Sequence, residues 1–119
     1  MSNQIFVRRG NSLPLEITPR DETTEEPYLL AEGDEIVFTV KANTSRGSPP
    51  LIEKTLTAAD YSEDGRLVLP IQPEDTVAMA PADYVYDCAI RFAQGDFITF
   101  AGPEKFTVLP ALSEKETAT

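Results

Sequence analysis

Hydrophobic and polar residues alternate in short stretches along most of this chain. The clearest stretch covers residues 84–92. A period of two residues places successive side chains on opposite faces of a β-strand. The face predicted to point into a hydrophobic core carries Tyr84, Tyr86, Cys88, Ile90 and Phe92.

The same alternation predicts further short strands, separated by ten prolines and six glycines. The expected strand ranges are 4–9, 12–19, 35–42, 51–57, 66–72, 84–92, 97–101 and 105–110. Gly102-Pro103 is expected to end strand 97–101 and to separate it from strand 105–110. Pro70 predicts that its strand lies at a sheet edge or contains a bulge. A single helical turn is expected within residues 73–83.

About seven to nine short strands, with turns at intervals of roughly 8–12 residues and almost no helix, predict an all-β fold. The expected architecture is an antiparallel β-sandwich of two sheets. A single domain is expected over residues 1–110, followed by a flexible tail at 111–119. Beside the five residues of strand 84–92, the expected core contains Ile36, Phe38, Val40, Leu67 and Leu69.

The charge balance disfavours two classes of partner. Twenty acidic and ten basic residues give the 119-residue chain a formal net charge of −10. Nucleic-acid binding depends on Lys and Arg that neutralise phosphates, and binding to an anionic membrane also requires basic residues. The opening residues "MSNQIFVRRG" lack the apolar core of a signal peptide, and no stretch is long and apolar enough for a membrane span. We therefore expect neither nucleic acid nor membrane as a partner, and a location in the cytosol or in a particle assembled from it.

The chain has few residues that could carry out catalysis. No histidine is present, so the Ser-His and Cys-His nucleophile pairs are absent. Cys88 is the single cysteine and lies on the apolar face of its strand, where burial makes a thiol inert. Acidic residues that could supply a glycosidase pair cluster in stretches such as Asp21-Glu22 and Glu25-Glu26, which are typical of a solvated surface. We expect no enzymatic activity and no cofactor.

One stretch has the beginning of a calcium-binding loop. Asp60, Ser62 and Asp64, followed by Gly65, match the opening Asp-x-Ser-x-Asp-Gly pattern. The twelfth position of such a loop needs a bidentate glutamate, and here it is Ile71. An Asp-Gly hairpin turn explains the stretch better, so no metal is expected, and these three residues are the only weak candidates.

Tyr86-x-Cys88 has the form found in strand F of immunoglobulin domains, where the tyrosine makes a tyrosine corner and the cysteine joins a core disulfide. The absence of a second cysteine assigns Cys88 to an ordinary core position.

Three valines, Val37, Val68 and Val85, lie on the faces of their strands that point away from the expected core. Our hypothesis is that these faces, where exposed, form a surface used in assembly.

Three stretches together resemble a known family: "GDEIVFTVKA" (33–42), "ADYVYDCAIRF" (82–92) and "GPEKFTVLPALSEKET" (102–117). They are similar to the N-terminal immunoglobulin-like domain of siphophage and prophage baseplate upper proteins. That family has a Gly-Asp before a strand, then a Tyr-x-Tyr-Asp strand, and a closing Phe-x-Val-x-Pro. The stretch "RRGNSLPLEIT" resembles the family's Arg-Gly-Asp start, with Asn11 in place of the aspartate.

The resemblance implies an immunoglobulin-like topology and a structural role without catalysis. The domain would act as a component of a phage or prophage virion, in the tail or baseplate region. Its partners would be other tail or virion proteins and copies of itself. The alternative from a different class is a ligand-binding β-sandwich module for carbohydrate or calcium.

Overall fold

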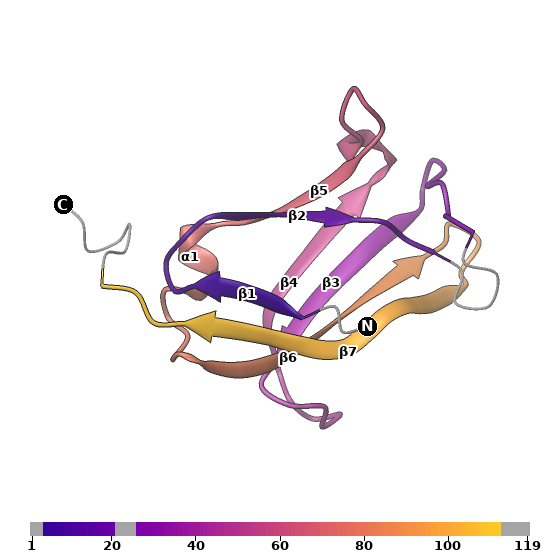
Figure 1. The fold of residues 1–119 in the computed structure, drawn as a ribbon. Helices are drawn as coiled ribbons and strands as arrows, with labels where there is room; N and C mark the ends of the chain where they lie inside the picture. Colours follow the sequence, from indigo (N-terminus) through magenta and orange to yellow (C-terminus); the bar gives the residue numbers. More distant parts are fainter. Residues whose placement is uncertain (1–3, 21–25, 113–119) are drawn as a thin grey trace.

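A computed structural model describes residues 4–20 and 26–112. Asp21-Glu22 and Glu25 of the acidic stretches, and most of the expected tail (113–119), lie outside these residues. The described chain forms two sheets, one with the order β1-β7-β6-β3-β4 and one with the order β2-β5 (Figure 1). The strands are β1 (Ile5–Arg8), β2 (Leu13–Ile17), β3 (Glu35–Lys41), β4 (Pro50–Thr57), β5 (Leu67–Ile71), β6 (Ala82–Arg91) and β7 (Phe97–Leu109).

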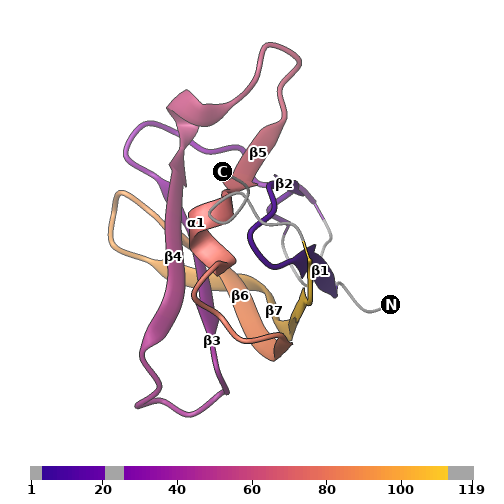
Figure 2. The same ribbon diagram turned by 90° about the vertical axis from the view of Figure 1, so that its left-hand side faces the viewer.

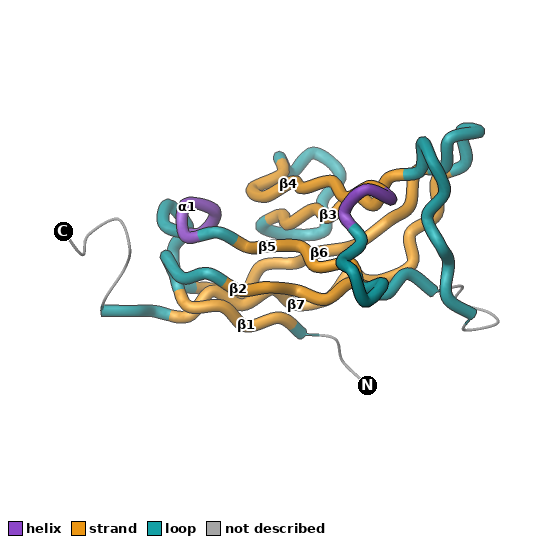
Figure 3. Tube along the Cα trace, turned by 90° about the horizontal axis from the view of Figure 1, so that it is seen from above, coloured by secondary structure: helices purple, strands orange, loops and turns teal. Residues whose placement is uncertain are grey.

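The two sheets face each other as layers, which Figure 2 shows with β2 and β5 on one side and β3, β4 and β6 on the other. Figure 3, coloured by secondary structure, shows strands joined by loops, with almost no helix. The predicted all-β sandwich is confirmed. Its pairs are antiparallel except for β1 and β7, which run parallel. No hairpin joins these two strands, so chain connectivity does not fix their relative direction.

The core lies between the two sheets and is built from the inward faces of both. Phe38, at its centre, is fully buried and packs against Tyr86, with ring centroids 5.5 Å apart, and against Phe106, at 6.2 Å. Tyr84 and Phe92 are partly buried and pack against the cluster. Its other buried members include Ile36, Val40, Ile52, Leu56, Leu67, Leu69, Ile71, Cys88, Ile90 and Val108.

Both strands of the smaller sheet carry a proline, and the two prolines face each other. Pro14 of β2 pairs with Pro70 of β5. Proline has no N–H to donate to a ladder and is found on edge strands. Among the described residues each of these strands has a single neighbour, so the edge position predicted from Pro70 is confirmed.

The expected break at Gly102-Pro103 is wrong. β7 continues through it, and both halves pair with β6, Tyr86 with Glu104 and Cys88 with Ala101. The register shifts beside this point, which is the mark of a β-bulge. Gly102 takes a positive φ of 88°, a conformation that glycine adopts without penalty. A bulge therefore bends one long strand where the composition predicted two short ones.

Two polar contacts hold the turns at opposite ends of the sandwich. The short helix α1 (Pro73–Thr76) confirms the predicted helical turn, and the buried Thr76 hydroxyl accepts a hydrogen bond from the Gly10 N–H at 2.8 Å. At the other end, the Asp34 carboxylate accepts from the N–H groups of Ala31 (2.9 Å) and Ala93 (3.0 Å). These backbone hydrogen bonds lower the pKa of Asp34.

Within the described residues, no helix has the length and apolar character to cross a membrane.

Candidate functional site

Cys88 and Tyr86 are neighbours on the inward face of β6. Cys88 is 2% exposed, and burial raises the pKa of its thiol to about 12. Burial, with contributions from Cys88 and Glu104, raises the pKa of the Tyr86 phenol to about 12 as well. The nucleophile of a cysteine enzyme needs a depressed pKa, and here the shift has the opposite sign.

The Cys88 thiol is expected to be inert in the folded protein. At pH 8, labelling by a disulfide reagent should be slower by about 100-fold or more than in denaturant, because both exposure and the thiolate fraction are low. Rapid native labelling would contradict this burial.

Because the pKa of the Cys88 thiol is raised in the folded state, the stability that the protonated thiol maintains is present below pH 9 and is lost as the pH rises toward 12. Cys88→Ala should therefore lose less stability than the wild type across that range and cost about 0–2 kcal/mol at pH 7.

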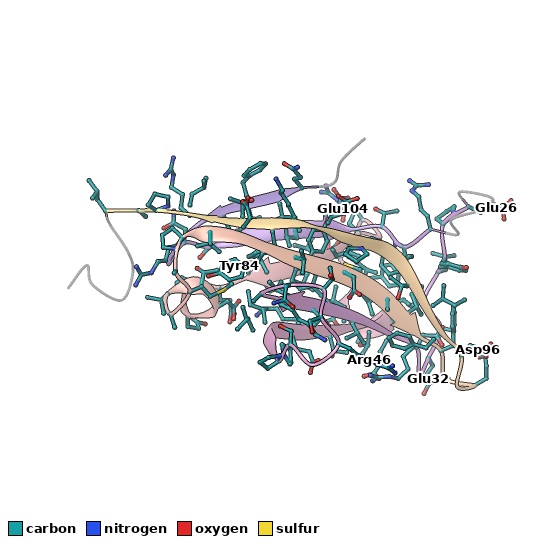
Figure 4. All side chains as sticks on the ribbon, turned by 90° about the horizontal axis from the view of Figure 1, so that it is seen from below. Glu26, Glu32, Arg46, Tyr84, Asp96 and Glu104 are labelled. Atoms are coloured by element: carbon teal, nitrogen blue, oxygen red, sulfur yellow. The ribbon has the colours of Figure 1, made fainter. Side chains whose placement is uncertain are left out.

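The hydrogen bond of a tyrosine corner is made by Tyr84. Its hydroxyl donates to the Ala80 carbonyl, four residues upstream, at 2.6 Å. Figure 4 shows Tyr84 near the α1 end of the sheet, with Glu32 and Asp96 at the other end. The Tyr86-x-Cys88 pattern had predicted this hydrogen bond for Tyr86, two residues further along β6. The Tyr86 ring instead occupies the core beside Phe38.

Tyr84→Phe is expected to lower the free energy of unfolding by about 0.5–1 kcal/mol, because it removes the hydroxyl and keeps the ring. Equilibrium unfolding in urea measures this difference. A variant as stable as the wild type would show that the bond to Ala80 contributes nothing to stability.

The three weak metal candidates are engaged with protein groups. The Asp60 carboxylate accepts a hydrogen bond from the Thr57 N–H at 2.7 Å. The Ser62 hydroxyl donates to Asp64, and the Arg66 guanidinium forms an ion pair with Asp64 at 2.9 Å. These bonds lower the pKa of Asp64. The part of the chain that the structure describes holds no group of three His, Cys, Asp or Glu side chains arranged for a metal ion.

The outer face of the larger sheet has a shallow recess of about 120 Å³. It is lined by Thr39, Lys41, Val85, Asp87 and Pro103, among others. Its single carboxylate, Asp87, has a pKa raised by desolvation, which Lys41 partly offsets. The hypothesis of an exposed valine surface is wrong for Val37, which is buried on this face; of the other two, Val85 is half-buried and Val68 is exposed.

A larger groove of about 560 Å³ opens between the two sheets. Its apolar lining comes from both layers: Ile5, Leu15, Ile17, Tyr86, Cys88, Phe100 and Ala101. The lining also contains the polar side chains of Gln4, Glu16 and Arg20. The groove, like the recess, therefore has a single carboxylate, whereas a glycosidase needs two. The sandwich is thus incompletely closed between β2 and the first half of β7.

Three large apolar side chains on β1 and β7 are exposed to solvent. Phe6 on β1 is 54% exposed, and Phe97 and Ile98 on β7 are 57% and 41% exposed. We call these three residues the β1–β7 margin. Sequence reasoning missed them, although "FITFA" (97–101) contains no charged residue and that absence was visible. Phe97 and Ile98 are adjacent at the start of β7, whereas Phe6 pairs with Thr107 near its end, so the margin has two separate exposed points. Large exposed apolar side chains of this kind are typical of protein interaction surfaces.

The strand order defines the class of fold. With β2 and β5 as strands B and E, the sheet β7-β6-β3-β4 corresponds to G-F-C-C′ of a variable-type immunoglobulin domain, so the chain is an immunoglobulin-like β-sandwich. No protein-family model and no curated protein matches the chain. One solved structure, from photo-crosslinking analyses of multimeric cell-adhesive interactions of VGSC beta subunits, aligns with 94% of this chain and 93% of its own. Its sequence identity is 12% and its TM-score 0.44.

Proposed function

We propose that this protein is a non-enzymatic structural component of a phage or prophage virion, in the tail or baseplate region. It acts as a rigid immunoglobulin-like unit that binds other virion proteins through its surface. The observation that carries the proposal is the exposed β1–β7 margin on a domain whose one thiol is buried and unreactive. The resemblance of residues 33–42, 82–92 and 102–117 to baseplate upper proteins supports the placement in a virion.

The margin has the composition of a binding surface. Aromatic residues are enriched at protein interfaces and supply much of their binding energy. Phe6 projects from the outer side of β1, since Val7 beside it is buried, and Phe97 lies near the start of β7. Burial of such side chains against a partner contributes roughly 1.5–3 kcal/mol each. A partner that covers Phe6, at the β1 end of the margin, would therefore gain affinity from it, and a partner at Phe97 would do so at the other end.

Binding to the products of neighbouring genes tests this role. Immobilised protein should retain at least one neighbouring tail or virion product, and Phe6→Ser should weaken that binding by about tenfold or more. Leu51→Ser is the matched control, because Leu51 is 44% exposed but lies on β4, at the far edge of the same sheet. It should change the affinity by less than about twofold. Failure to bind any neighbouring product would overturn the proposal.

A further inference from the structure

Most free edges of this sandwich carry features that oppose pairing with another strand. β2 and β5 contain Pro14 and Pro70. β4 begins at Pro50 and carries Glu53-Lys54, and β1 has only four residues. Prolines, charges and short length are the features by which natural sheets block edge-to-edge association.

The first half of β7 lacks these features. Residues Phe97–Ala101 pair with β6 on one side, and among the described residues no strand pairs with them on the other, because β1 first meets β7 at Phe106. Four of these five residues are aromatic or β-branched, and the same number are apolar, with Thr99 as the one polar residue. Such an edge presents unpaired N–H and C=O groups to another chain.

The lack of charge also favours association at this edge; β5 is uncharged as well, but Pro70 interrupts it. The chain has a formal net charge of −10, so two copies repel each other over most of their surfaces. Residues 97–103 carry no charge, and Asp96 and Glu104 bound them. A second copy can therefore approach here without facing a like charge.

The edge is also complementary to itself. In an antiparallel pair centred on Thr99, Ile98 of one copy lies opposite Phe100 of the other, and Phe97 lies opposite Ala101. This register places Asp96 opposite Gly102, so that Asp96 and Glu104 do not face each other. Apolar cross-strand pairs of this kind stabilise antiparallel sheets. Pro103 ends the pairing because it has no N–H to donate.

We propose that two copies of this chain form a symmetric dimer by antiparallel pairing of Phe97–Ala101, which joins their five-stranded sheets into one. The inference rests on the proposed assembly function and names one partner for it, a second copy. Five residues per copy make a small interface, so the dimer should be weak, with dissociation in the micromolar to submillimolar range. Added salt should strengthen it, because salt screens the repulsion between the two negative chains.

Sedimentation velocity between about 10 µM and 1 mM, on the full chain and two variants, tests the dimer. Thr99→Lys places two like charges opposite each other on the two-fold axis and should raise the dissociation constant by about tenfold or more. Thr55→Lys is the matched control. Thr55, Val37, Ala89 and Thr99 form one row across the sheet, so both lysines would project from the same face, at opposite edges. The control makes the same charge change and should alter dimerisation by less than about twofold.

Amide hydrogen exchange gives a second measurement that needs no variant. In the wild type, the amides of residues 97–101 should exchange more slowly at 500 µM than at 5 µM, and those of β4 should not change. A wild type that is monomeric at 1 mM, or a dimer that Thr99→Lys leaves intact, would overturn the inference. Binding to neighbouring virion proteins would survive either result, so the two proposals fail separately.

Discussion

Replacing Gly102 by alanine is expected to lower the free energy of unfolding by about 3 kcal/mol or more, from backbone strain and overpacking together. The added Cβ would lie 2.5 Å from the Tyr86 carbonyl oxygen and 2.9 Å from the Asp87 Cα. Both are backbone atoms of β6, which is paired on both sides and cannot move away without loss of hydrogen bonds. The φ of 88° adds strain of its own for a residue with a side chain.

Gly65→Ala separates the two causes. Gly65 has a similar φ of 81°, but an added Cβ meets nothing within 4 Å. Its substitution should cost only the conformational term, about 1 kcal/mol. Urea unfolding of both variants measures the difference. Equal losses at the two positions would show that β7 does not approach β6 as closely as the bulge at Gly102 requires.

Phe38→Ala is expected to cost about 3–5 kcal/mol, the range for removal of a large aromatic side chain from a core. Phe38 is fully buried and contacts the rings of Tyr86 and Phe106 from two other strands of its sheet. Its loss leaves a cavity at the point where the inward faces meet. Because a domain of this size has roughly 5–15 kcal/mol of stability, the variant should be close to unfolding at 37 °C.

Phe6→Ala is the control for that experiment. It removes the same ring from a site that is 54% exposed on β1, and should change stability by less than about 0.5 kcal/mol. Thermal and urea unfolding of both variants provide the comparison. A Phe38 variant as stable as the Phe6 variant would contradict the position of the core.

The strands could be predicted because one face of each is buried, and burial leaves a two-residue period in the sequence. That period located β3 and β6 to within two residues. It failed at Gly102-Pro103, because composition alone does not distinguish a bulge within a strand from a break between strands. Only the pairing of both halves of β7 with β6 resolves the two cases.

The candidate site was less accessible to sequence reasoning. Whether Phe6 or Phe97 is covered depends on which strand edges have neighbours, and that is a property of sheet order. Val37 shows the same limit: it lies on the outer face but is buried between β4 and β6. The corner hydrogen bond of Tyr84 depends on the path of the chain after α1, and the pattern Tyr86-x-Cys88 contains no information on that path.

The sandwich has one buried thiol, an uncharged free edge without proline at Phe97–Ala101, and exposed phenylalanines on β1 and β7. We propose that the exposed phenylalanines and the free edge form surfaces for binding proteins. The strong net charge limits where acidic partners, including a second copy, can approach. Assembly through protein contacts is therefore the function that we propose for this fold.

Mass spectrometry of particles purified from the organism that encodes this chain tests whether the protein is a virion component. We predict that peptides of this protein co-purify with phage or phage-tail particles in a fixed ratio to the other tail proteins. Its absence from such particles, with all of the protein recovered unassembled in the lysate, would contradict the claim.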